Sequence, residues 1–244
     1  MDVCGGQGPG ARVPDVTRRD EVAAALDRLE RRLTAACSAA GRDRSDVLLV
    51  AVTKTRPASD VALLRDLGVV DVGENRDQEA SAKAAEVEGV RWHFVGAVQS
   101  NKARSVASYA DVVHSLDRPS LADALSAGAQ RAERDLDVLL QVSLDGDPAR
   151  GGALPADLPA LAEKAATAPR LRLRGVMAVA PLDADPAAAF DALAGITQQL
   201  QADHPYAREV SAGMSGDLEA AIAAGATIVR VGTALLGRRP PPSR

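Results

Sequence analysis

Short apolar runs alternate with helical stretches along almost the whole chain, and this alternation constrains the fold more than any other feature. Eight runs rich in β-branched or apolar residues have the length of strands. They are Val47–Thr53, Val69–Val72, Trp92–Val95, Val112–Leu116, Val138–Val142, Leu171–Val179, Arg208–Ser211 and Thr227–Val231. The stretches between them, rich in Ala, Leu, Glu and Arg, are Ser59–Leu67, Arg76–Val87, Lys102–Ala107, Ser120–Arg134, Leu158–Thr167, Pro186–Ala202 and Asp217–Ala224.

Strands that alternate with helices form a parallel sheet, because each crossover returns the chain to the same end of the sheet. Eight such strands predict a single (β/α)8 barrel of the TIM type, an α/β fold; an open doubly wound sheet is the alternative. The length of 244 residues suits one barrel of ~200–250 residues. An added amphipathic helix is predicted before the first strand, from the helical spacing of Val22, Leu26, Leu29, Leu33 and Cys37.

We expect a flexible tail at residues 1–17, the barrel at 18–239 and a short C-terminal tail at 240–244. The first segment is rich in Gly and Pro and lacks the apolar core of a signal peptide. No apolar run approaches the ~20 residues of a membrane span, and the net charge of −4 comes without a basic stripe for nucleic acid. Cys4 and Cys37 form neither a disulfide framework nor a metal set. These features favour a cytoplasmic protein with no nucleic-acid or membrane partner.

Lysine is scarce in this chain, so each lysine calls for an explanation. Only four of the 29 basic residues are lysines, and Lys54 directly follows the first predicted strand. In barrels of this kind, chemistry takes place at the carboxyl ends of the strands. A desolvated lysine there is a nucleophile that condenses with an aldehyde to form a Schiff base. A lysine at a strand end can equally extend its ammonium group to solvent, and position alone leaves both interpretations open.

Two loops of small residues, near the seventh and eighth predicted strands, fit a phosphate group. The segment Ser211–Asp217 contains two glycines and opens a helix, so several backbone N–H groups can face one anion. Gly232 and Thr233 follow the eighth strand, and barrels often bind phosphate at these two positions. Ser215 also suits an ordinary helix N-cap. Two adjacent loops in the favoured place nevertheless favour the phosphate.

Arg230 and two histidines lie on predicted strands, where a buried polar side chain needs a partner. Pointing inward, Arg230 faces a ring nitrogen or a phosphate; pointing outward, it pairs with a neighbouring helix. For His114 we favour a hydrogen-bonded core residue over a general base, and for His93 a packing role. The sequence shows no Ser/His/Asp set and no metal-ligand spacing, so no metal is expected.

Nine short motifs follow one another from about residue 20 to residue 239. They are Ala51–Pro57, Gly73–Asn75, Gln78–Glu79, Trp92–Gly96, Gln99–Lys102, Arg174–Met177, Gly213–Ser215, Glu219–Ile222 and Val229–Thr233. Each is common alone, but the ordered set resembles the family of pyridoxal 5'-phosphate (PLP) homeostasis proteins. The barrel of that family is similar to the N-terminal domain of alanine racemase.

The resemblance implies a set of cofactor-binding residues: Lys54, Asn75, Ser211, Met214, Ser215, Arg230, Gly232 and Thr233. Lys54 forms the internal aldimine with PLP, and Asn75 lies beside the ring. Two serines and the backbone at 232 and 233 hold the phosphate. Arg230 faces the pyridine nitrogen and keeps it unprotonated, so the ring becomes a poorer electron sink.

We therefore expect a monomeric PLP carrier that buffers the cofactor and contacts apo PLP enzymes transiently, without strong catalysis of its own. The alternatives are a PLP-dependent amino-acid racemase and a cofactor-free aldolase that uses Lys54. Racemases of this fold add a second β domain and use a tyrosine as the opposing base. This chain ends soon after the eighth predicted strand, and neither Tyr109 nor Tyr206 is an obvious base at the rim.

Overall fold

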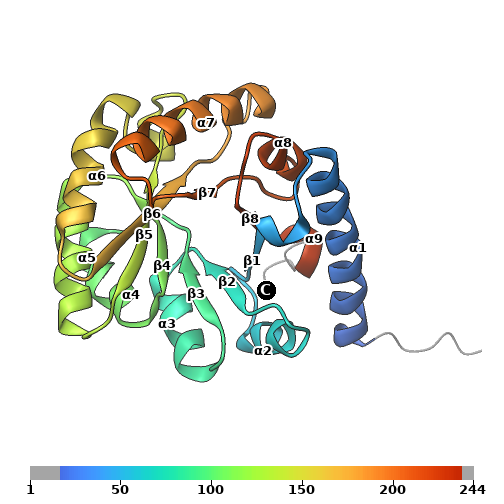
Figure 1. Cartoon of the computed structure of the whole chain (residues 1–244). Helices are drawn as coiled ribbons and strands as arrows, with labels where there is room; N and C mark the ends of the chain where they lie inside the picture. Colours follow the sequence, from blue (N-terminus) through green and yellow to red (C-terminus); the bar gives the residue numbers. More distant parts are fainter. Residues whose placement is uncertain (1–16, 238–244) are drawn as a thin grey trace, which may run out of the picture.

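The computed structural model describes residues 17–237, in which eight parallel strands close into a barrel (Figure 1). The strands are β1 (Leu48–Val52), β2 (Asp71–Glu74), β3 (Arg91–Phe94), β4 (Val112–Leu116), β5 (Leu136–Gln141), β6 (Leu171–Met177), β7 (Glu209–Ser211) and β8 (Ile228–Val231). Each strand pairs with the next, and β8 pairs with β1. The predicted (β/α)8 barrel is confirmed. Apart from Thr17, both predicted tails lie outside the described residues.

Helices connect the strands and surround the barrel (Figure 1). They are α2 (Ala58–Asp66), α3 (Asp77–Glu86), α4 (Ala103–Tyr109), α5 (Pro119–Arg131), α6 (Leu158–Thr167), α7 (Pro186–Asp203), α8 (Leu218–Ala223) and the short α9 (Thr233–Leu236). Single 3-10 turns occur at Arg44–Asp46, Ser100–Lys102, Pro148–Arg150 and Pro155–Asp157. The sequence did not predict α9 or these turns, because each is too short to show a period.

The second strand is displaced from its predicted position by two residues. The prediction followed the apolar residues and began at Val69, whereas β2 runs from Asp71 to Glu74. The carboxylate of Glu74 is buried at the end of the strand, with hydrogen bonds from Lys83 and Thr53. A buried acid with such partners is stable, but it hides the strand from a search for apolar residues.

The predicted first helix is α1 (Arg18–Ala39), which lies beside α8 and α9 on the outside of the barrel (Figure 1). Thr17 and Asp20 form a reciprocal capping box at its start, an arrangement that contributes about 1 kcal/mol. The apolar face of α1 packs on Leu49 of β1 and Val229 of β8. The helix therefore supports β1, which leads to Lys54, and β8, which carries Arg230.

Alternating residues of each strand separate the inside of the barrel from the outside. Val50, Val112, Leu139, Met177 and Ile228 form one apolar cluster, while their sequence neighbours pack against the helices. Because side chains alternate along a strand, Arg230 lies on the same face as Ile228 and points inward. This orientation resolves the two alternatives left open for Arg230. No helix in the described part of the chain is long and apolar enough to cross a membrane.

Candidate cofactor-binding site

A cavity of about 570 Å³ opens at the carboxyl ends of the strands. This volume lies in the range of small-molecule sites, about 300–1,000 Å³. Seven of the eight residues predicted from the sequence line it: Lys54, Asn75, Met214, Ser215, Arg230, Gly232 and Thr233. Residues from β1, β6 and β8 and from the loops after β1, β2, β3 and β7 thus meet at one end of the barrel, the end at which barrel enzymes carry their chemistry.

Lys54 lies two residues beyond β1, in a turn that faces this cavity. Lys54 is exposed, so it reaches solvent at the mouth of the cavity that it lines. The next residue, Thr55, has a φ of 64°, a conformation that costs a non-glycine residue about 1 kcal/mol or more. The N–H of Thr55 donates to the carboxylate of Glu79 at 2.6 Å, which holds the turn in place.

Lys83 of α3 is buried directly beneath the turn. Its Nζ donates to the carbonyl of Thr53 at 2.9 Å and to one carboxylate oxygen each of Glu74 and Glu79, both at 2.6 Å. Three acceptors surround the ammonium group, so the charge is paired rather than isolated. The sequence analysis noted the scarcity of lysine but gave Lys83 no role. Its position four residues after Glu79 was the available signal.

Two buried oxygens beside this cluster have no hydrogen-bond partner among the described residues, Glu74 Oε2 and Asn75 Oδ1. Burial raises the pKa of Glu74, and the hydrogen bonds from Lys83 and Thr53 offset this only in part. A buried acceptor without a partner costs about 1–3 kcal/mol. Because Asn75 lines the cavity, a ligand there can satisfy its amide.

The loop after β7 and the first turn of α9 present backbone donors to the cavity. The N–H groups of Ser215, Gly216 and Thr233 donate to no other described residue, and all three residues line the cavity. Gly232 allows the close approach, since a Cβ there would lie 3.0 Å from the carbonyl oxygen of Val52. A concave group of free N–H donors binds anions, so this part of the cavity suits a phosphate.

Arg32 of α1 supports the outer side of this loop. Its guanidinium donates to the carbonyl of Ser215 at 2.8 Å and to both carboxylate oxygens of Glu219. The sequence analysis missed Arg32, because one arginine on the polar face of a helix carries no signal. Its partners lie more than 180 residues away along the chain.

Arg230 contributes a cation to the inner wall of the cavity. Its Nη1 donates to the hydroxyl of Ser211 at 2.5 Å and its Nη2 to the carbonyl of Ala178 at 2.9 Å. Burial lowers the pKa of Arg230 to about 10, so the side chain stays charged at neutral pH. Lys54, Arg56 and Arg230 are the titratable side chains along the cavity wall, and all three are basic.

Ser211 is the one predicted site residue that the structure does not bring to the cavity. As the last residue of β7 it points into the barrel, where it is fully buried. In place of the predicted contact with a phosphate, its hydroxyl accepts a hydrogen bond from Arg230 and contacts His114 Nδ1 at 2.9 Å. Ser211 therefore contacts Arg230 from inside the barrel and is not among the residues that line the cavity.

Comparisons with known proteins identify the family. Residues 25–240 match the family model described as alanine racemase, N-terminal domain. The pyridoxal phosphate homeostasis protein of Mycobacterium tuberculosis is 44% identical, over 91% of this chain and 94% of its own length. The chain belongs to the pyridoxal phosphate homeostasis protein family.

Solved structures agree with this family. PipY of Synechococcus elongatus, solved with PLP bound, is 36% identical over 88% of this chain and 100% of its own, with a TM-score of 0.78. The alanine racemase of Clostridium difficile has a TM-score of 0.72 at 12% identity, and 58% of its chain is covered. The racemase likeness shows the shared barrel alone, whereas the homeostasis family spans nearly the full length of the chain.

The structure confirms the interpretation of His114 and changes that of His93. His114 is a buried, hydrogen-bonded core residue, as the sequence analysis favoured. His93, assigned to packing, instead makes two hydrogen bonds, to Asp71 and to His114. No group of three or more His, Cys, Asp or Glu side chains suited to a metal occurs within residues 17–237.

Proposed function

We propose that this protein binds PLP as a Schiff base on Lys54 and acts as a carrier, which buffers the cofactor and releases it to apo PLP enzymes. One observation carries the proposal: a lysine amine, a group of free backbone N–H donors and a fixed cation line the same cavity. PLP combines an aldehyde, a phosphate and a pyridine ring. The family name and the PLP bound to PipY point to the same ligand.

Each part of the cavity has a partner on the cofactor. The N–H groups of Ser215, Gly216 and Thr233 would hold the phosphate, and Asn75 offers its buried, unpaired oxygen beside the ring. Lys54 supplies the amine. When bound, the cofactor supplies an aldehyde and an electron-withdrawing ring. The residues present therefore match the aldehyde, the ring and the phosphate of PLP.

The charges along the cavity favour a carrier over a catalyst. Arg230 remains a cation at neutral pH and, facing the pyridine nitrogen, would oppose its protonation. An unprotonated ring stabilises carbanions poorly. The tyrosines lie elsewhere: Tyr109 hydrogen-bonds Asp77, and Tyr206 contacts His204. These features support binding without the proton abstraction that a racemase needs.

Borohydride trapping tests the covalent part of the proposal. The purified protein is mixed with PLP, reduced with borohydride and mapped by peptide mass spectrometry, with only four lysines to distinguish. We expect one pyridoxyl adduct, on Lys54. An adduct confined to Lys83, Lys102 or Lys164, or none at all, contradicts the proposal.

A turnover assay tests the carrier role. The protein loaded with PLP is incubated with single amino acids, and the two enantiomers are separated by chiral chromatography. We expect no multiple turnover. A racemase needs a second proton acceptor opposite the lysine, and the residues that line the cavity include no Asp, Glu, His, Cys or Tyr. Steady formation of the other enantiomer would establish a racemase instead.

Replacing Arg32 by alanine is expected to weaken PLP binding without unfolding the barrel. The side chain is 35% exposed, so its ion pair contributes about 1 kcal/mol or less to stability. The loop that holds the phosphate loses a restraint, and we expect the Kd for PLP to rise about threefold to tenfold. Calorimetric titration measures this change.

The matched control for this variant is Arg44→Ala. Like Arg32, Arg44 forms an ion pair with a glutamate, in this case Glu30 of α1. Arg44 does not line the cavity. The Kd of the control is expected to stay within twofold of wild type. Equal effects of the two substitutions would show that Arg32 has no special role at the loop.

A further inference from the structure

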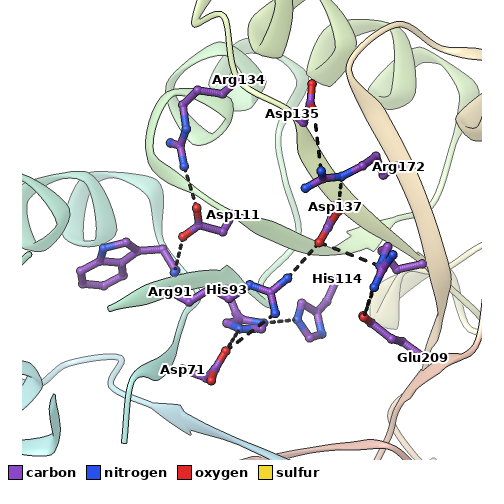
Figure 2. Close-up of polar contacts among 12 residues, drawn as sticks. Asp71, Arg91, His93, Asp111, His114, Arg134, Asp135, Asp137, Arg172 and Glu209 are labelled. Carbon is purple, nitrogen blue, oxygen red and sulfur yellow. Dashed lines mark hydrogen bonds and ion pairs between the residues drawn. The ribbon is translucent and has the colours of Figure 1, made fainter. Parts of the chain in front are cut away.

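A continuous line of hydrogen bonds runs through the inside of the barrel and ends at the cavity. His93 Nε2 lies 2.8 Å from Asp71 Oδ1, and His93 Nδ1 lies 2.9 Å from His114 Nε2 (Figure 2). His114 Nδ1 then lies 2.9 Å from Ser211 Oγ. The hydroxyl of Ser211 accepts from Arg230 at 2.5 Å. The line connects five strands, in the order β2, β3, β4, β7 and β8.

The two ends of the line lie at opposite ends of the barrel. Asp71 and Arg91 are the first residues of β2 and β3 and pair in register, so they mark the amino ends of the strands. Arg230 lines the cavity at the carboxyl ends. Between them, the exposed fractions of His93, His114 and Ser211 are 1%, 0% and 0%. Each polar atom in this interior must therefore find its partner within the line.

The chemistry of the two ends fixes the direction of every proton between them. A guanidinium only donates, so Ser211 accepts from Arg230 and has its single proton left for His114 Nδ1. His114 then carries its proton on Nε2 and donates to His93 Nδ1. His93 in turn donates from Nε2 to the carboxylate of Asp71, which only accepts when ionised. Both rings are thus neutral and share one tautomer.

Asp71 lies at the edge of a group of ion pairs at the amino ends of the strands. Arg91 Nη1 lies 3.9 Å from Asp71, and its Nη2 lies 2.9 Å from Asp137 (Figure 2). Asp137 also pairs with Arg172 at 2.7 Å. Burial, with the neighbouring His93, Arg230 and Arg91 as lesser causes in that order, lowers the pKa of His114 well below its usual range. That ring is therefore neutral at pH 7, as the direction of the line requires.

We propose that Asp71 is a positioning residue for the cofactor site, which acts through His93, His114 and Ser211 to hold Arg230. The hydroxyl of Ser211 accepts from Arg230 and has a fixed orientation while His114 Nδ1 accepts its proton. If the direction of the line reverses, His114 donates to Ser211 and the serine proton loses its acceptor. Arg230 is then held by a hydroxyl without a fixed orientation and by the carbonyl of Ala178. The effect on the cofactor rests on the proposed function, whereas the direction of the line does not.

Nuclear magnetic resonance of the histidine rings in the protein without cofactor tests the direction. The chain has three histidines, and His204→Gln removes the one outside the line. We expect both remaining rings to carry their proton on Nε2 at pH 7, with Nδ1 unprotonated. A proton on Nδ1 of either ring, or a doubly protonated ring, overturns the proposal. This measurement uses the native line and does not depend on whether a variant folds.

Asp71→Asn tests the consequence for the site. An amide can donate or accept, so the two rings are expected to populate both tautomers. We expect the Kd for PLP to rise roughly tenfold, the lower end of the effect of removing residues that orient the ligands of a metal ion. The visible absorption band of the bound cofactor is expected to shift with it.

Asp137→Asn is the matched control, because Asp137 pairs with Arg91 and Arg172 in the same group of ion pairs but touches neither histidine. We expect unchanged tautomers and a Kd within twofold of wild type. Equal Kd values for the two variants overturn the positioning role. If wild-type protein traps no PLP on Lys54, the proposed function fails, while the tautomer result stands on its own.

Discussion

Replacing Lys83 by methionine is expected to lower the free energy of unfolding by about 3–5 kcal/mol, the cost of breaking a buried ion pair by removing one partner. Methionine fills a similar volume, but Glu74 is left without its cation in a place where burial already raises its pKa. Denaturation in urea, followed by circular dichroism, measures the loss.

The loss is expected to depend on pH. A carboxyl group whose folded pKa exceeds its unfolded value binds more protons in the folded state, so its contribution to stability falls as the pH rises through that interval. The pKa of Glu74 is raised above 4.5 in the folded protein, and removal of Lys83 raises it further. The loss in the free energy of unfolding caused by Lys83→Met is therefore expected to become smaller as the pH is lowered from 7 toward 5.

Lys102→Met is the control for this substitution. Lys102 has an exposed side chain, 49% accessible, and lies 3.6 Å from its partner Asp77, so the loss is expected to stay below about 1 kcal/mol. Lys83 also holds the carbonyl of Thr53, next to Lys54. The yield of pyridoxyl adduct on Lys54 should fall in Lys83→Met and not in the control. An unchanged yield would limit Lys83 to a role in stability.

The barrel could be predicted from the sequence because its signal is local. Apolar runs of four to eight residues separated by helical stretches suffice to define a parallel sheet, and glycine or lysine directly after a strand shows which loops face the site. The same logic failed at β2, where Glu74 is buried and paired. A pattern of hydrophobicity cannot distinguish a buried acid that has partners from an exposed one.

The contacts that organise the site depend on barrel closure and were therefore not predictable. Arg32 meets Ser215 only because α1 packs across β1 and β8. His93 meets His114 only because β3 and β4 are neighbours in register. Ser211 shows the limit most clearly: it ends the seventh strand as predicted, but its contacts with His114 and Arg230 come from two other strands.

Lys54→Ala is expected to abolish the borohydride-stable adduct and to raise the Kd for PLP roughly a hundredfold, which corresponds to about 2.7 kcal/mol. The remaining affinity comes from the backbone donors of Ser215, Gly216 and Thr233, which the substitution leaves in place. Because the side chain of Lys54 is exposed, the melting temperature should stay within about 2 °C of wild type. Absorbance titration and equilibrium dialysis measure the two quantities.

Pyridoxamine 5'-phosphate separates the covalent role of Lys54 from its charge. This compound keeps the ring and the phosphate but carries an amine in place of the aldehyde, so it cannot condense with a lysine. We expect wild type and Lys54→Ala to bind it with Kd values within about threefold of each other, since the phosphate loop and Arg230 are the same in both. A hundredfold loss for this compound as well would mean that Lys54 acts as a cation. Unchanged PLP binding in Lys54→Ala would place the cofactor elsewhere.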